Sequence, residues 1–180
     1  MNAGRTEAAI SEGRAPYVEG AFAVTVDPRE QRPWRLPLSI PIVVRAMVAG
    51  DYAPVGLETR CAVERKSLDD LVNSIFFSPG RFRRELEKLK KYEWRRIIVE
   101  ASYEDILARK YFASGRKFRP AIFGGGVTKR PGIEPMQVLE KIETITDTLV
   151  PIVMAGSRKA AATIALRRLR QFWEEKRLTR

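Results

Sequence analysis

A chain of 180 residues with 44% hydrophobic and 31% charged residues predicts one globular domain with room for a core. It has no histidine and one cysteine, which excludes histidine-based triads, histidine metal ligands, soft-metal sites and an internal disulfide. Any metal ion must therefore be a hard one with oxygen ligands, which means Mg²⁺ or Mn²⁺. No apolar run approaches the roughly 18 residues of a membrane helix, so we expect no membrane partner.

The net charge of +11 and the pI of about 10.1 indicate a polyanionic partner, and nucleic acid is the commonest one. The alternative is a solvated basic surface that binds nothing. The N-terminus lacks the basic-then-apolar layout of a secretion signal, and the lone Cys61 fits a reducing compartment. We therefore expect a cytoplasmic protein that associates with the nucleoid by binding DNA.

The chain begins with a predicted flexible tail, residues 1–18, and residues 19–180 are predicted to form a single domain. Residues 21–27 and 42–48 have the β-branched and apolar composition of strands, and a loop with four prolines separates them. Residues 49–56 read as a turn because of Gly50 and Gly56, and residues 59–66 form the third strand. Short connections between the three predict an antiparallel meander.

Helices and further strands alternate after this meander. Ser67 is a predicted N-cap, and the apolar residues from Leu68 to Ile75 have helical spacing before the break at residues 78–80. A basic helix over 81–94, a strand over 96–101 and a short helix over 103–111 follow. After an irregular segment over 113–132 come a helix over 134–150, a strand over 151–156 and a long helix over 157–176. This order predicts an α/β domain.

Acidic and basic side chains converge at one end of the predicted sheet. Glu64 and Lys66 flank Arg65, and residues i and i+2 lie on the same face of a strand. Asp51 precedes Glu64 by thirteen residues, and Asp27 ends the first predicted strand. In a meander these three acids and the lysine would meet. The alternative is an ordinary Glu–Lys surface pair worth less than about 1 kcal/mol.

This set of side chains suits metal-dependent hydrolysis of a phosphodiester. Two or three carboxylates can hold a hard divalent cation, which lowers the pKa of a bound water and polarises the phosphate. A neighbouring lysine can orient that water or stabilise the charge that develops at phosphorus. No step requires histidine, so the pattern predicts a metal-dependent phosphodiesterase.

Several motifs, in the same order, resemble the nuclease domain of the XPF-type structure-specific endonucleases. The motif G-D…E-R-K-x-x-x-D falls on Gly50, Asp51, Glu64, Arg65, Lys66 and Asp70. The upstream V-D-x-R-E resembles residues 26–30, and G-R-F (80–82) and I-I-V-E (97–100) also resemble the family pattern. The similarity runs from about Phe22 to Phe172.

The resemblance implies a restriction-endonuclease-like core of the PD-(D/E)xK type, with a mixed central sheet flanked by helices. It implies Mg²⁺- or Mn²⁺-dependent cleavage of DNA near a branch point such as a 3′ flap or a fork, and it allows a homodimer. Better-known members carry a helix-hairpin-helix module after the nuclease domain. None is found here, so we expect a compact stand-alone form like those of bacteria and phages.

Residue roles follow from the resemblance together with the chemistry above. The expected metal ligands are Asp51, Glu64, the Arg65 carbonyl and Asp27, and Lys66 is expected to act on the attacking water. Glu30, Arg65 and Asp70 are expected to support or orient these groups.

Basic residues near the motif are candidates for contacts with the DNA backbone. They are Arg81, Arg83, Arg84, Lys88, Lys91 and, in the glycine-rich segment, Lys129. A solvated helix face is the alternative for the residues of 81–91. Trp34 could stack on a base or pack within its loop. The rival to the enzyme hypothesis is a catalytically inert basic protein that binds DNA or RNA with a nuclease-like fold.

Overall fold

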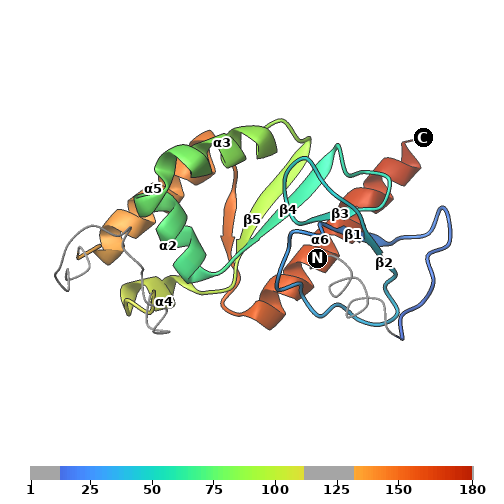
Figure 1. Ribbon diagram of the computed structural model, residues 1–180, viewed down its shortest axis with the longest axis horizontal. Helices are drawn as coiled ribbons and strands as arrows, with labels where there is room; N and C mark the ends of the chain where they lie inside the picture. The colour runs from blue at the N-terminus through green and yellow to red at the C-terminus, as the bar shows by residue number, and fades with distance from the viewer. Residues whose placement is uncertain (1–12, 112–131, 180) are drawn as a thin grey trace, which may run out of the picture.

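The computed structural model describes residues 13–111 and 132–179 (Figure 1). Lys129 and the glycine run at 124–126, which were predicted to lie near DNA, fall outside these residues, as does most of the predicted N-terminal tail. Within residues 13–18 of that tail, the Arg14 guanidinium donates hydrogen bonds to the carbonyls of Leu36 and Pro37. Across the described ranges, no helix combines the length and apolarity required to cross a lipid bilayer.

A six-stranded mixed sheet forms the centre of the fold, in the order β2-β1-β3-β4-β5-β6. Its strands are β1 (Val24–Val26), β2 (Ile42–Val44), β3 (Tyr52–Pro54), β4 (Cys61–Lys66), β5 (Trp94–Val99) and β6 (Ile152–Met154). Strand β3 is antiparallel to both β1 and β4, whereas the pairs β1–β2, β4–β5 and β5–β6 are parallel. The mixed sheet expected from the sequence is therefore present.

The predicted meander is wrong in its topology. Strand β2 lies at the edge of the sheet, parallel to β1, because the proline-rich residues 28–41 carry the chain back to the starting end of β1. The segment expected to be a turn contains β3, which pairs on both sides and is fully buried. The Tyr52 hydroxyl accepts a hydrogen bond from the Trp34 N–H at 2.8 Å. The two rings stack with centroids 4.5 Å apart, so Trp34 packs within the protein.

The helices begin close to the predicted positions. They are α2 (Leu68–Phe77), α3 (Pro79–Leu89), α4 (Tyr103–Leu107), α5 (Pro135–Thr148) and α6 (Arg158–Leu178). Ser67 caps α2, and its side chain accepts a hydrogen bond from the N–H of Asp70, as the sequence predicted. Helix α3 ends at Leu89, earlier than the predicted 94, because Trp94 already belongs to the buried strand β5.

The two faces of the sheet bury separate apolar cores. Helices α2, α3 and α5 cover one face, where Leu71, Leu86 and Val138 are buried. Helix α6 covers the other face together with residues 34–40, and Figure 1 shows it crossing strands β3, β4 and β5. Alternation along β4 sends Ala62 to the first core and Cys61 to the second. Glu64 and Lys66 therefore share the α2–α3 face, whereas Arg65 points to the α6 face.

Gly50 lets the chain turn sharply into β3 against the side of β4. Its φ is +81°, and a Cβ at this position would lie 2.9 Å from the Cβ of Ala62 and 3.3 Å from the Val63 carbonyl oxygen. Both the left-handed backbone and the close approach therefore require glycine. Gly56 has a similar φ of +82°, but nothing lies within 4 Å of its missing Cβ.

We predict that Gly50→Ala lowers the free energy of unfolding by about 3 kcal/mol, because it adds a core clash to the roughly 1–2 kcal/mol of backbone strain. Gly56→Ala is the matched control and should cost only the backbone strain. Urea denaturation followed by circular dichroism measures both. Equal losses in the two variants would show that the approach of Gly50 to Ala62 is not a constraint on the fold.

Candidate active site and metal centre

Three hydrogen bonds hold Asp51 between β1 and β4. Its N–H donates to the Val63 carbonyl at 2.8 Å, and its carbonyl accepts from the N–H of Asp27 at 2.9 Å. Its carboxylate Oδ2 accepts the N–H of Arg65 at 2.7 Å. The Asp51 side chain is thereby fixed beside the end of β4, next to Glu64, although the strands that were expected to bring them together are not neighbours.

Asp51 and Glu64 repel each other in a poorly solvated site. Burial raises the pKa of Asp51 well above its usual value, and the negative charge of Glu64 raises it further. Burial also raises the pKa of Glu64, although Lys66 partly opposes this shift. A cation between the two acids would relieve both the repulsion and the loss of solvation.

Lys66 lies beside this acidic pair, as predicted. Its Nζ is 3.4 Å from Oε1 of Glu64 and 5.0 Å from the ring centroid of Phe82, and only 8% of the residue is exposed. It lines a polar cavity of about 260 Å³ between α2 and α3. Asp70 and Arg81 line the same cavity, and the Asp70 carboxylate accepts a hydrogen bond from the Ser67 hydroxyl at 2.7 Å.

The Arg65 side chain lies on the opposite face of the sheet and makes a two-pronged ion pair with Glu100. Its Nε and Nη2 donate to the two oxygens of Glu100 at 2.7 and 2.8 Å, and Glu30 lies 3.5 Å from its Nη1. Glu100 also accepts hydrogen bonds from Trp34 Nε1 at 2.7 Å and Arg158 Nη1 at 2.8 Å. This cluster fixes the Arg65 backbone, whose N–H holds Asp51.

Glu100 had no predicted role, although it ends both an apolar strand and the I-I-V-E motif. Arg29 was also missed, apart from its place in the V-D-x-R-E motif. Its side chain is 68% exposed, and the charges of Asp27, Asp51 and Glu64 all act to raise its pKa. Arg29 therefore lies near the acidic pair, held by Asp27 and the Met47 carbonyl, with most of its side chain still exposed to solvent.

Asp27 does not add a third carboxylate with free oxygens to the pair of Asp51 and Glu64. Its Oδ1 accepts from the N–H and Nε of Arg29, and its Oδ2 accepts from Arg29 Nη2 and the N–H of Met47, all within 2.8 Å. Burial acts to raise the pKa of Asp27, but these hydrogen bonds outweigh it and leave the pKa below its usual value. Asp27 orders the loop that presents Arg29.

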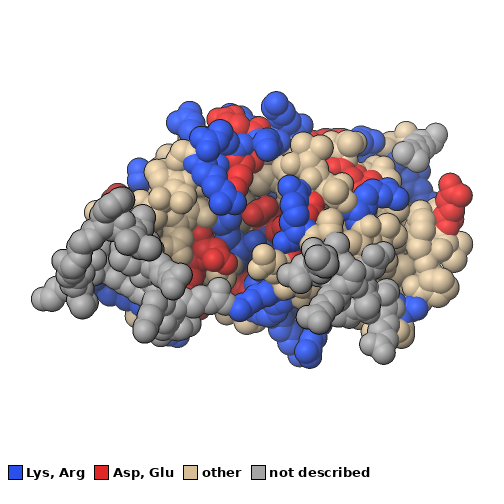
Figure 2. Space-filling model, viewed as in Figure 1, with Lys and Arg blue, Asp and Glu red and all other residues tan. Residues whose placement is uncertain are grey.

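The candidate DNA contacts on and after α3 are exposed, namely Arg81, Arg83, Arg84, Lys88 and Lys91. Arg81 and Arg83 form i,i+4 pairs with Glu85 and Glu87, so part of this basic charge is neutralised locally. Figure 2 shows blue and red side chains mixed over α3. Arg81 differs from the others because it reaches the cavity that Lys66 lines.

The donor set fits a hard divalent cation that keeps several water ligands. Among residues 13–111 and 132–179, no three or more histidine, cysteine or acidic side chains gather as a metal site. Two carboxylates plus a backbone carbonyl are nevertheless sufficient for Mg²⁺, which is bound through one or two carboxylates and retains water. Burial disfavours the ionised form of both Asp51 and Glu64 and raises the pKa of each, so added positive charge would stabilise the pair.

The mixed sheet with helices on both faces is a restriction-endonuclease-like fold. Comparison with protein families matches residues 26–165 to the ERCC4 domain, so the chain belongs to the ERCC4 domain family.

The fold is also similar to a solved structure, XPF from Aeropyrum pernix, with a TM-score of 0.57 and 22% sequence identity. The match covers 82% of this chain and 65% of that one, so the chain spans less than two thirds of the archaeal protein's length. A search of curated proteins found no match.

The acid pair predicts how stability depends on pH. Because the folded-state pKa values of Asp51 and Glu64 are raised, the folded protein binds more protons than the unfolded chain between the unfolded and folded pKa values. Protonation of these acids therefore stabilises the fold fully at pH values below their unfolded-state pKa. This stabilisation is lost as the pH rises through their folded-state pKa. We therefore predict that Asp51→Asn stabilises the metal-free protein at neutral pH by on the order of 1 kcal/mol.

Urea denaturation with a chelator, at neutral and at acidic pH, measures this gain. It should disappear in acid, where the wild-type carboxyl is protonated as well. Glu143→Gln, an exposed change on α5, is the control and should have little effect at either pH. A neutral-pH loss of stability in Asp51→Asn would contradict a half-buried pair of acids that repel each other.

Proposed function

We propose that this chain is a divalent-metal-dependent endodeoxyribonuclease that cuts DNA near branched structures such as 3′ flaps or forks. The observation that supports it most is the acidic pair of Asp51 and Glu64, with the Lys66 Nζ 3.4 Å from Glu64. Membership of the ERCC4 family supports the nuclease activity. The preference for branched DNA and the formation of a homodimer rest on the resemblance to XPF-type nucleases.

The proposed metal ligands are the carboxylates of Asp51 and Glu64 and the carbonyl of Arg65. The ion is Mg²⁺ or Mn²⁺, and when bound it supplies an activated water and a Lewis acid for the phosphate. Asp27 is a weaker candidate than the sequence suggested, since Arg29 and Met47 already use both of its oxygens. Its proposed task is to hold the loop that carries Arg29.

Lys66 is the proposed group that orients the attacking water. Its position between Glu64 and the Phe82 ring keeps the ammonium directed at the cavity between α2 and α3. A fixed positive charge there lowers the energy of the negative charge that builds on the phosphate in the transition state. Asp70 lines the same cavity and is proposed to order the water that Lys66 holds.

Glu30, Arg65 and Glu100 are proposed to position the site from the other face of the sheet. Their ion pairs fix the Arg65 backbone, and a misplacement of about 1 Å at a reacting group can cost about 10²-fold in rate. Substrate phosphates would meet Arg29, Arg81 and the exposed cations of α3. Lys129 remains a proposed contact on the basis of its sequence context alone.

The alternative is an inert basic protein that binds DNA or RNA, which the net charge of +11 would also support. The complete set of Asp51, Glu64 and Lys66 favours the enzyme, since an inert protein has no need to keep two repelling carboxylates beside each other. Chemistry and binding respond differently to substitution, so the two proposals can be separated.

We predict that Asp51→Asn lowers Mg²⁺-dependent cleavage of a fluorescent 3′-flap DNA by about 10²-fold or more. The shape of the side chain is kept while a metal ligand is lost. DNA affinity, measured by anisotropy in chelator, should hold or rise because a negative charge facing phosphate is removed. Lys66→Ala should also abolish cleavage but weaken binding slightly.

Lys141→Ala, which removes an exposed cation on α5, is the control for Lys66→Ala and should cut at the wild-type rate. Linear, nicked and forked DNAs in the same assay test the proposed preference for branches. Near wild-type cleavage by both Asp51→Asn and Lys66→Ala would overturn the assignment of the site. Absence of cleavage by the wild-type protein in Mg²⁺ and Mn²⁺, with DNA binding intact, would favour the inert alternative.

A further inference from the structure

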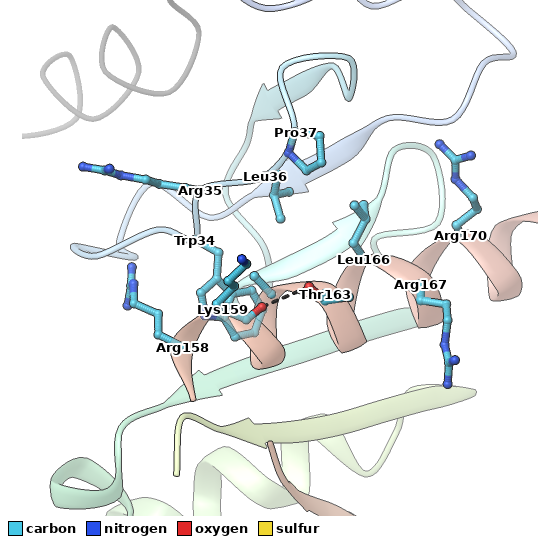
Figure 3. A pocket seen from close by; sticks show the side chains of 11 residues that line it. Trp34, Arg35, Leu36, Pro37, Arg158, Lys159, Thr163, Leu166, Arg167 and Arg170 are labelled. Atoms are coloured by element: carbon cyan, nitrogen blue, oxygen red, sulfur yellow. Dashed lines mark hydrogen bonds between the residues drawn. The ribbon is translucent and has the colours of Figure 1, made fainter. Parts of the chain in front are cut away.

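A second and larger cavity, of about 830 Å³, lies between residues 34–37 and helix α6 (Figure 3). It is separate from the cavity that Lys66 lines, because helix α6 and residues 34–40 cover the other face of the sheet. We call it the α6 groove. Its lining residues are Trp34, Arg35, Leu36, Pro37, Arg158, Lys159, Ala162, Thr163, Leu166, Arg167 and Arg170.

The α6 groove combines apolar walls with a rim of cations. Leu36 and Pro37 face Leu166 of helix α6 across the groove. Figure 3 also shows Arg158 and Arg170 at its two ends. Five of the eleven lining residues are lysine or arginine, and none is acidic. A ligand with both apolar surface and negative charge is therefore complementary to this groove.

Most of this positive charge is not neutralised by the protein. Arg158 pairs with Glu100 at 2.8 Å and donates to the carbonyls of Arg32 and Pro33. Among the described residues, no salt bridge is found for Arg35, Lys159, Arg167 or Arg170. Like charges gathered along one groove cost stability unless an anion binds there.

We propose that the α6 groove binds single-stranded DNA. A single strand offers apolar base faces together with one negative charge per nucleotide, whereas a duplex keeps its base faces stacked inside. The groove follows α6 from Arg158 to Arg170, which is about 18 Å at a rise of 1.5 Å per residue and suits a segment of a few nucleotides. Trp34 contributes to the wall but stays stacked on Tyr52.

The end of the groove at Arg158 is linked to the candidate active site. Arg158 and Arg65 share Glu100, and the Arg65 N–H holds the Asp51 carboxylate. If the chain is the endonuclease proposed above, on which this point rests, the groove would hold an unpaired arm of the branched substrate. Binding of single-stranded DNA itself does not require that the chain cut DNA.

Binding of a short fluorescent oligothymidine to the full chain, followed by anisotropy in chelator over a series of salt concentrations, tests the proposal. The groove variant is Lys159→Gln with Arg170→Gln, and the matched control is Lys141→Gln with Arg168→Gln. Each double variant removes two exposed cations. Arg168 lies on α6 but does not line the groove. Arg170 also lies 4.9 Å from the Phe22 ring centroid, so its substitution could lower stability. Thermal unfolding therefore checks that both double variants fold.

The groove variant should bind more weakly, and the slope of log affinity against log salt should become shallower by about 1.4, as expected for two lost contacts with a single strand. The control should keep the wild-type slope. Thr163→Glu, which places a carboxylate at an exposed groove position, should also weaken binding.

Equal slope changes in the two double variants would overturn the proposal, because they would indicate general attraction to a basic surface. Polyglutamate that competes as well as unlabelled oligothymidine would instead identify an acidic protein segment as the occupant. A dimer that dissociates only in the groove variant would identify a second copy of the chain. Since no cleavage is measured, these outcomes do not depend on the proposed nuclease activity.

Discussion

The hydrogen bond from the Arg65 N–H to the Asp51 carboxylate is the contact on which the site depends, because it fixes the side chain that the pairing of β3 with β4 brings beside Glu64. Gly50 permits it by letting β3 start against Ala62. The ion pair of Arg65 with Glu100 supports it from the other face of the sheet. Backbone geometry, packing and ion pairing therefore all help to fix the position of the Asp51 carboxylate.

This arrangement weakens the metal-free protein, because burial raises the pKa of both Asp51 and Glu64 and the charge of Glu64 raises the pKa of Asp51 further. Lys66 offsets the charge of Glu64 only in part, at 3.4 Å. A divalent cation would supply the missing charge. The low stability of the metal-free site and the affinity for a metal would then have the same physical origin.

Local patterns in the sequence predicted the local structure well. Ser67 and the spacing of Leu68, Leu71 and Ile75 predicted α2, and the alternation through Glu64 and Lys66 placed both on one face of β4. Strand β3 was missed because Tyr52–Pro54 is short, contains proline and lies between two turn glycines, so only its pairing with β1 and β4 makes it a strand. The role of Glu100 depends on the parallel register of β4 and β5, which no local pattern reveals. The same applies to Asp27, whose partners include Met47 twenty residues away.

The most direct test of this account is a crystal structure of the protein soaked in Mn²⁺, with anomalous scattering used to locate the ion. The account predicts one strong anomalous peak in contact with the carboxylates of both Asp51 and Glu64, with Lys66 next to it and Asp27 still bound to Arg29. A peak that contacts only one of the two acids, or no peak between them at saturating Mn²⁺, would contradict the claim that their repulsion creates a metal site.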